Sequence, residues 1–273
     1  MPEPSSEPRL VGRYDAGEVR RRLEAEGVLD ALVEKGFGAF DVTIDATTHA
    51  LPCVLVFARR GAERHLLLEA VIGESSLDAD FFARRGYAVD RPMVFVLVYW
   101  LREQDPTRRS SAERPLLPLQ LHPGLGVLRR AFRVVTSMAA DLGKDGVASV
   151  PKFFHDAVLF YRSRLFLFAD GREQGRFEAL MRDLARLPLG DASLALACGE
   201  VRTAAGDPAV WSMGYQVFPL SERARAYFHS PVYEAEVRAG IEQSSFTCDA
   251  HQRRRDRGAR LLGLPTLGER RAV

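Results

Sequence analysis

The sequence has few cysteines and no long hydrophobic run. The three cysteines, Cys53, Cys198 and Cys248, are far apart and form no Cys-x-x-Cys pair, which argues against a disulfide framework and against a zinc site. The six histidines show no metal-ligand spacing either, so the sequence predicts no metal. Because no apolar run approaches about 20 residues, it also predicts no membrane span.

Neither sign of charge is in large excess. Lys plus Arg number 38 and Asp plus Glu 36, a net charge of +2. Proteins that bind nucleic acid through their overall charge are usually more basic, which argues against nucleic acid as a partner. We interpret the arginine-rich stretch 253–260 as a solvated segment; the alternative is a segment that contacts nucleic acid or an acidic partner. Only three basic residues are lysine, which indicates a GC-rich bacterial genome; the alternative is phosphate recognition by arginine.

The chain of 273 residues is 47% hydrophobic, which is enough for a large core. Its first residues lack a basic start followed by an apolar stretch, so we expect no signal peptide and a cytoplasmic location. The predicted organisation is a disordered N-terminus (1–14), a core (15–170), a helical C-terminal extension packed on the core (171–251) and an arginine-rich tail (252–273).

Hydrophobic periodicity predicts an α/β fold with a mostly helical C-terminal portion. The run at 93–101 is apolar on both faces, so we expect it to be a central strand. The predicted order of the core is a helical segment over 15–36, strands over 40–45, 54–58, 65–72 and 93–101, a loop over 103–121, a helix over 128–142, a strand over 146–150, a helix opened by Pro151 and a strand over 165–168.

The most informative motif is a glycine-rich turn. His122-Pro123-Gly124-Leu125-Gly126 leads directly into a predicted helix. Exposed amides and the positive end of a helix together suit a phosphate group; the alternative is an ordinary turn that starts a helix. No Gly-Lys-Ser/Thr follows, and arginine replaces the third glycine of a dinucleotide fingerprint, which excludes a Walker loop and disfavours a Rossmann motif.

A tyrosine follows on the next predicted helix. Tyr161 lies one helical turn after Ala157. A tyrosine hydroxyl there could give a proton to a departing thiolate; the alternative is a core tyrosine whose hydroxyl lies at the rim.

The order of these elements resembles the GNAT acyltransferase superfamily over residues 15–170. The resemblance implies a mixed sheet with flanking helices, in which two parallel strands splay apart and acetyl-CoA or another acyl-CoA lies between them. It implies that the amides of Gly124, Leu125, Gly126 and Val127 hold the pyrophosphate and that Tyr161 is the general acid. The stretch 160–166 is similar to the family's Phe/Leu-Tyr-x-x-x-Gly-Phe.

Several positions depart from the family pattern. Leu121 stands where the family has Gln or Arg, Phe154 where it has Asn, and Leu165 where it has Gly. About twenty residues also separate the central strand from the turn. The predicted function is transfer of an acyl group from coenzyme A to a small-molecule or peptide amine; the alternative is a non-catalytic binding or regulatory protein on the same scaffold.

An amine acceptor needs a general base. The candidates are Glu69, at a strand end, and Glu103, where the central strand ends; the alternative for each is a solvated charge. His122 and His155 could also act as a base or contact phosphate; the alternative for each is a helix-cap or rim histidine. The strands at 93–101 and 146–150 should lie parallel and diverge beside the turn at Gly124.

Overall fold

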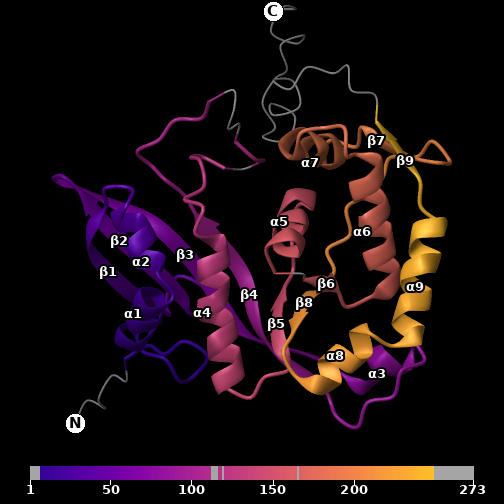
Figure 1. The fold of residues 1–273 in the computed structure, drawn as a ribbon, viewed down its shortest axis with the longest axis horizontal. Helices are drawn as coiled ribbons and strands as arrows, with labels where there is room; N and C mark the ends of the chain where they lie inside the picture. Colours follow the sequence, from indigo (N-terminus) through magenta and orange to yellow (C-terminus); the bar gives the residue numbers. More distant parts are fainter. Residues whose placement is uncertain (1–6, 112–115, 119, 165, 249–273) are drawn as a thin grey trace, which may run out of the picture. The chain divides into compact units, whose positions relative to one another are not determined.

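The computed structural model describes residues 7–111, 116–118, 120–164 and 166–248 (Figure 1). Leu165, the first six residues and the arginine-rich tail lie outside the described residues. The chain divides into two compact units. The first lies within Met1–Ser111, Leu121–Ser149 and Val217–Arg225, and the second within Ala112–Gln120, Val150–Gln216 and Ala226–Val273. The division therefore cuts the predicted 15–170 core after residue 149.

The protein is a mixed α/β structure, as predicted. A seven-stranded sheet has the order β1-β2-β3-β4-β5-β8-β6, and β7 and β9 form a small antiparallel pair. The strands are β1 (Gly38–Asp45), β2 (Cys53–Arg60), β3 (Glu63–Leu77), β4 (Met93–Glu103), β5 (Gly146–Ser149), β6 (Leu167–Phe168), β7 (Val201–Thr203), β8 (Gln216–Pro219) and β9 (Phe246–Cys248). Strands β1 to β4 pair antiparallel with their neighbours, whereas β4 and β5 are parallel. The doubly apolar β4 is central, as expected.

The helices match the predicted segments with shifted ends. They are α1 (Ala16–Ala25), α2 (Val28–Val33), α3 (Ala79–Ala83), α4 (Leu128–Asp141), α5 (Phe154–Arg164), α6 (Gly171–Asp183), α7 (Leu189–Ala197), α8 (Glu222–Phe228) and α9 (Pro231–Glu242). Pro151 was expected to open this helix, but α5 begins three residues later, at Phe154. None of the described helices is both long and apolar enough to cross a membrane.

In the first unit, α1 and α4 cover one face of the sheet (Figure 1). Alternate strand residues such as Val54, Leu68 and Leu101 face Leu23 and Phe132 of the two helices, around an apolar cavity of about 40 Å³. This layer is the core that fixes the end of β4 relative to the start of α4.

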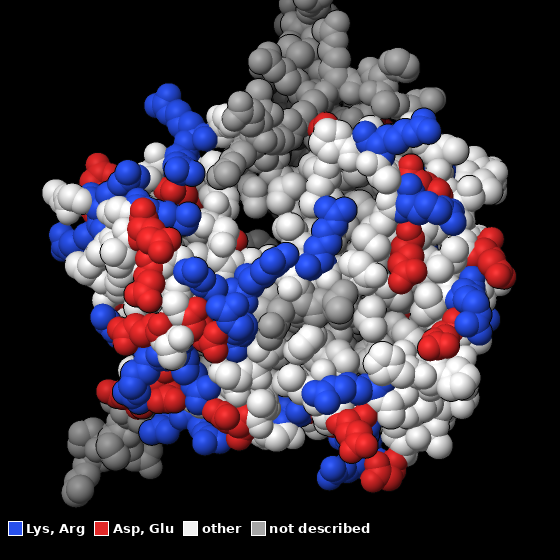
Figure 2. Space-filling view, in the orientation of Figure 1, with Lys and Arg blue, Asp and Glu red and all other residues white. Residues whose placement is uncertain are grey.

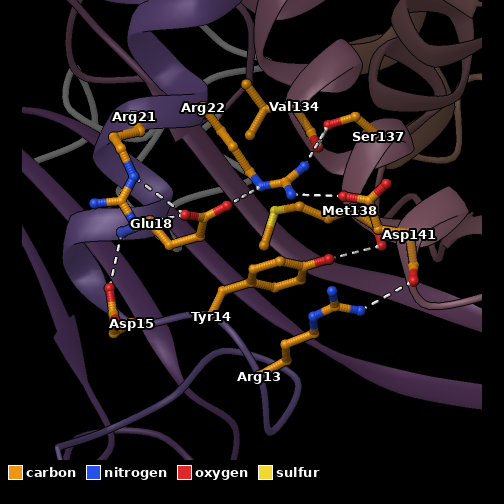
Figure 3. A network of polar contacts seen from close by, with 10 residues as sticks. All are labelled: Arg13, Tyr14, Asp15, Glu18, Arg21, Arg22, Val134, Ser137, Met138 and Asp141. Atoms are coloured by element: carbon orange, nitrogen blue, oxygen red, sulfur yellow. Dashed lines mark hydrogen bonds and ion pairs between the residues drawn. The ribbon is translucent and has the colours of Figure 1, made fainter.

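A polar network joins the start of the chain to α4 (Figure 3). The Tyr14 hydroxyl donates to the Met138 carbonyl at 3.2 Å, and Arg22 donates to Ser137 Oγ at 3.0 Å and to the Asp141 carboxylate. Tyr14 is only 2% exposed and Leu10 1%. Residues 10–14 are therefore packed, which corrects the expectation that the N-terminal 14 residues are disordered.

Exposed charges on this unit are neutralised locally. On α1, Arg20 pairs with Glu24 at 2.9 Å and Arg21 with Glu18 at 2.6 Å. Figure 2 shows blue and red side chains interspersed over this region. Such pairs contribute little to stability, but they leave the surface over α1 without a strong field of one sign.

A buried carboxylate holds β5 to the segment 217–225 of the same unit. The side chain of Asp145 accepts from the Val94 amide at 2.8 Å, from the Ser221 hydroxyl at 2.7 Å and from Arg223 Nε at 2.7 Å. Burial raises the pKa of Asp145, but these hydrogen bonds outweigh it and leave the pKa below its ordinary value.

The second unit has its own core, in which aromatic rings pack edge to face. Phe177 of α6 contacts Phe168 and Trp211. Helices α6 and α9 lie so close together that a Cβ on Gly175 would be 2.1 Å from the Val237 carbonyl oxygen. Glycine is therefore required at that helix crossing.

Candidate functional site

The candidate site lies where β4 extends past β5. Their parallel pairing runs from Phe95–Gly146 to Val98–Ser149 and ends there. The antiparallel pairing with β3 continues to Leu68–Glu103. The predicted parallel arrangement is thus confirmed, and the last five residues of β4 extend beyond the paired part of β5.

The glycine-rich turn lies at this end of β4. Gly126 has a φ of +72°, which glycine adopts without strain. The Val127 amide donates to Glu103 Oε2 at 3.1 Å, and the Gly126 amide also donates to this carboxylate. Val127 is the N-cap residue of α4 and has no capping side chain. Glu103 therefore supplies the acceptor that the helix start otherwise lacks.

Glu103 is a partly buried acid with an unusual pKa. Burial raises its pKa to about 7, although hydrogen bonds from the Val127 and Gly126 amides and the charge of Lys35 lower it. The side chain lies on the same sheet face as Leu68 and Leu101, the face covered by α4. The solvated-charge alternative does not describe this residue, because its carboxylate is partly buried and accepts hydrogen bonds from the amides at the start of α4.

The structure thus brings together two features that were predicted separately. Gly126 and Val127, predicted to hold a pyrophosphate, hold the carboxylate of Glu103, a predicted base. The neighbouring Gly124 is close to the same residue, because a Cβ on it would lie 3.7 Å from Glu103 Oε1. The Leu125 side chain is 2% exposed and points into the core. In this structure the turn binds a carboxyl group that belongs to the protein.

Glu69, the other predicted base, is elsewhere. It pairs across the sheet with Arg102, and the adjacent pair is Leu68–Glu103. Since successive strand residues point to opposite faces, Glu69 and Glu103 lie on opposite faces of the sheet. Glu69 Oε2 accepts from Arg102 at 2.9 Å and from Trp100 Nε1 at 3.2 Å, so it is neither solvated nor part of the Glu103 site.

Tyr161, the predicted general acid, belongs to the second unit. Its ring lies edge to face against Phe177, with centroids 5.6 Å apart. Burial and the nearby Glu178 charge raise its pKa, so it keeps its proton at neutral pH. Its surroundings match the alternative of a packed tyrosine.

His155, also in the second unit, is a core residue rather than a rim residue. It is 4% exposed, its Nδ1 lies 2.8 Å from Ser193 Oγ, and its Nε2 lies 3.2 Å from Asp156 Oδ1. The chain of contacts from Asp156 through His155 to Ser193 resembles a catalytic triad, but Ser193 is 1% exposed. A buried hydroxyl of this kind satisfies the histidine and does not meet a substrate.

Sequence reasoning missed one group of possible metal ligands. His49, Cys53 and Glu69 place their ligand atoms within 4.8 Å of one another. Burial, with the charges of Glu69 and Asp45, raises the pKa of Cys53 to about 11. The three residues come from a loop and two strands, so only the strand register could have revealed them.

Comparison with family models, curated proteins and solved structures gave no match for this chain. Its function is therefore inferred from the geometry of the two sites.

Proposed function

We propose that the first unit binds acyl-CoA at the 124–127 turn and that the protein transfers the acyl group to an amine. The observation that carries this proposal is the parallel β4–β5 pair, whose pairing ends at Val98 while β4 extends to the turn. Together with the resemblance to acyltransferases, it supports a nucleotide thioester at this end of the sheet.

In this proposal the Glu103 carboxylate occupies the anion site that the coenzyme phosphate takes when acyl-CoA binds. A phosphate group carries more negative charge than a carboxylate and has more acceptor oxygens, so the Gly126 and Val127 amides favour it. Because the pKa of Glu103 is about 7, a large fraction of the side chain is already protonated at neutral pH. A protonated acid binds the two amides weakly, which lowers the cost of exchange.

The amine attacks the thioester carbonyl carbon, the C–S bond breaks, and a base takes the proton that the nitrogen loses. A displaced Glu103 would stay beside the pyrophosphate, which the pantetheine arm separates from the thioester, so Glu103 as that base stays a prediction from the sequence. A base with a pKa near 7 suits proton transfer at neutral pH. Protonation of the thiolate by Tyr161 stays a prediction from the resemblance.

One observation counts against acyl transfer and favours the non-catalytic alternative, because the predicted phosphate site requires unpaired amides at the turn. The Val127 amide already has an intramolecular acceptor at 3.1 Å. A scaffold that keeps its anion site filled with its own carboxylate could serve as a binding or regulatory protein. The two functions differ in whether the protein releases free thiol from acyl-CoA.

A pair of glycine variants tests acyl-CoA binding. Gly126 and Gly143 lie near opposite ends of α4, with φ of +72° and +62°, and at both positions an added Cβ would have no other atom within 4 Å. Alanine at either position should cost about 1 kcal/mol of stability. Only Gly126→Ala should lower acetyl-CoA affinity, by about tenfold, because only it distorts the turn amides.

The measurement is calorimetric titration of the full chain with acetyl-CoA, followed by detection of free thiol with a panel of amines. Binding that is weakened by Gly126→Ala alone, together with thiol release, supports the enzyme. Binding with the same variant pattern but no thiol release supports the non-catalytic alternative. If the wild-type protein binds no acetyl-CoA at millimolar concentration, the acyl-transfer proposal is wrong and the non-catalytic alternative is favoured.

A further inference from the structure

A second cluster of polar side chains lies on the sheet face opposite Glu103. His49 Nε2, Cys53 Sγ and a carboxylate oxygen of Glu69 all lie within 4.8 Å of one another, and His49 Nε2 is 3.9 Å from Glu69 Oε1. Zinc–ligand bonds of about 2.0 to 2.3 Å place the ligand atoms of a tetrahedral site about 3.5 Å apart. Small side-chain movements would therefore bring the three atoms to ligating distance.

We propose that His49, Cys53 and Glu69 bind one Zn²⁺ ion. The set offers one nitrogen, one sulfur and one oxygen. A thiolate and an imidazole favour Zn²⁺ among the abundant divalent cations, whereas Mg²⁺ and Ca²⁺ prefer oxygen ligands alone.

The strand register places two of the ligands. Cys53 of β2 is opposite Val71, and Leu55 of β2 is opposite Glu69 of β3. Cys53 and Glu69 are therefore diagonal neighbours on one face, close enough for their side chains to meet. Both backbones belong to the antiparallel part of the sheet, which gives the site a rigid base.

The loop that carries His49 is fixed on both sides. Before it, the Asp45 carboxylate accepts from the Thr47 amide at 2.7 Å and from the Thr48 hydroxyl. After it, Leu51 lies over Gly73, where a Cβ would be only 2.9 Å from a Leu51 methyl group. The glycine at position 73 leaves room for the loop to lie against the sheet and bring His49 to Cys53.

The carboxylate of Glu69 is oriented like that of a metal ligand. Its Oε2 is held by Arg102 and by Trp100 Nε1, while its Oε1 faces His49. Partners on one oxygen that orient the other are typical of the surroundings of metal-binding carboxylates. Once the ion has displaced the Cys53 proton to solvent, the cluster carries a net charge of −1 with Arg102 counted, which offsets part of the charge of the bound divalent cation.

Three protein ligands leave one position of the tetrahedron for water. The His49 side chain is 40% exposed, which gives the ion a path from solvent. On binding, the ion replaces the thiol proton of Cys53, which in the metal-free state is directed toward the Val54 carbonyl at 3.8 Å. Because this cluster and Glu103 are on opposite faces, metal binding here does not depend on acyl transfer at the turn.

Co²⁺ is the probe for this site, because a Co²⁺–thiolate bond absorbs strongly in the near ultraviolet. The full chain is treated with a chelator, titrated with Co²⁺ and then with Zn²⁺ in competition. We expect thiolate absorption that saturates at one equivalent and is abolished by Zn²⁺. His49→Ala should weaken binding at least about tenfold, and Cys53→Ser should remove the absorption.

The matched controls are His229→Ala and Cys248→Ser, which change the same residue types in the second unit and should leave the titration unchanged. Circular dichroism checks the fold of each variant; if Cys53→Ser does not fold, His49→Ala decides the matter, since His49 is exposed. Absence of thiolate absorption in the wild-type protein, or equal affinity in His49→Ala, would overturn the proposal.

Discussion

Replacing Asp145 with alanine is expected to lower the free energy of unfolding of the first unit by about 3 kcal/mol or more. The Asp145 side chain is 8% exposed and that of Arg223 is 26% exposed. Removing the carboxylate leaves Arg223 without its main partner and leaves the Val94 amide without its acceptor. The loss is costly because the partly buried Val94 amide has no other acceptor among the described residues, and because Arg223 keeps only two backbone carbonyls and the distant Asp90.

The measurement is urea unfolding followed by tryptophan fluorescence. The chain has two tryptophans, Trp100 in the first unit and Trp211 in the second, so a Trp211→Phe background makes the signal report the first unit. The matched control is Asp90→Ala, which removes a more distant partner of the same arginine, 83% exposed and 3.7 Å away. It should change stability by less than about 0.5 kcal/mol; equal losses in the two variants would contradict the role given to Asp145.

Most of the fold could be predicted from the sequence because its signals are local. Asp15 caps α1 and accepts from the Glu18 amide at 2.8 Å, as the sequence order indicates. The long apolar run at 93–101 predicted a central strand correctly. Strands β7 and β9 were missed because each has three residues, too few for a periodic pattern. Helix α7 begins at Leu189 with Pro188 as its N-cap residue and Asp191 in its first turn, so its start does not follow the usual rule that a polar side chain caps a helix.

The candidate site could be predicted only in part, for a different reason. The sequence indicated Glu103 as a base and the 124–127 turn as an anion site, but about twenty residues separate them. Whether the Glu103 carboxylate reaches the turn depends on the path of the intervening loop in the folded protein, which no local sequence pattern specifies. His49, Cys53 and Glu69 likewise meet only through the β2–β3 register, and a search for close pairs of cysteines or histidines does not find them.

Glu103 should make the first unit less stable as the pH rises. Its pKa is about 7 in the folded protein, against 4.5 for an ordinary glutamate. Below pH 4.5 the side chain is protonated in both the folded and the unfolded state, so it causes no loss of stability. Between pH 4.5 and about 7 the unfolded chain ionises first, so the free energy of unfolding falls. The full shift corresponds to about 3 kcal/mol, which partial solvent access reduces to about 2 to 3 kcal/mol.

Glu103→Gln isolates this effect, because glutamine keeps the shape and one acceptor but does not titrate. The wild-type profile also contains groups of opposite sign: Asp145 has a lowered pKa and loses its stabilising effect as the pH falls. We therefore expect the difference between variant and wild type to shift in favour of glutamine by about 2 to 3 kcal/mol from pH 4.5 to 7.5. Glu24→Gln, at an exposed ion pair, should give a flat difference. A flat difference for Glu103→Gln too would mean that the carboxylate is ionised and well solvated at neutral pH, and an acid of that kind would neither leave the turn amides easily nor take a proton from an amine.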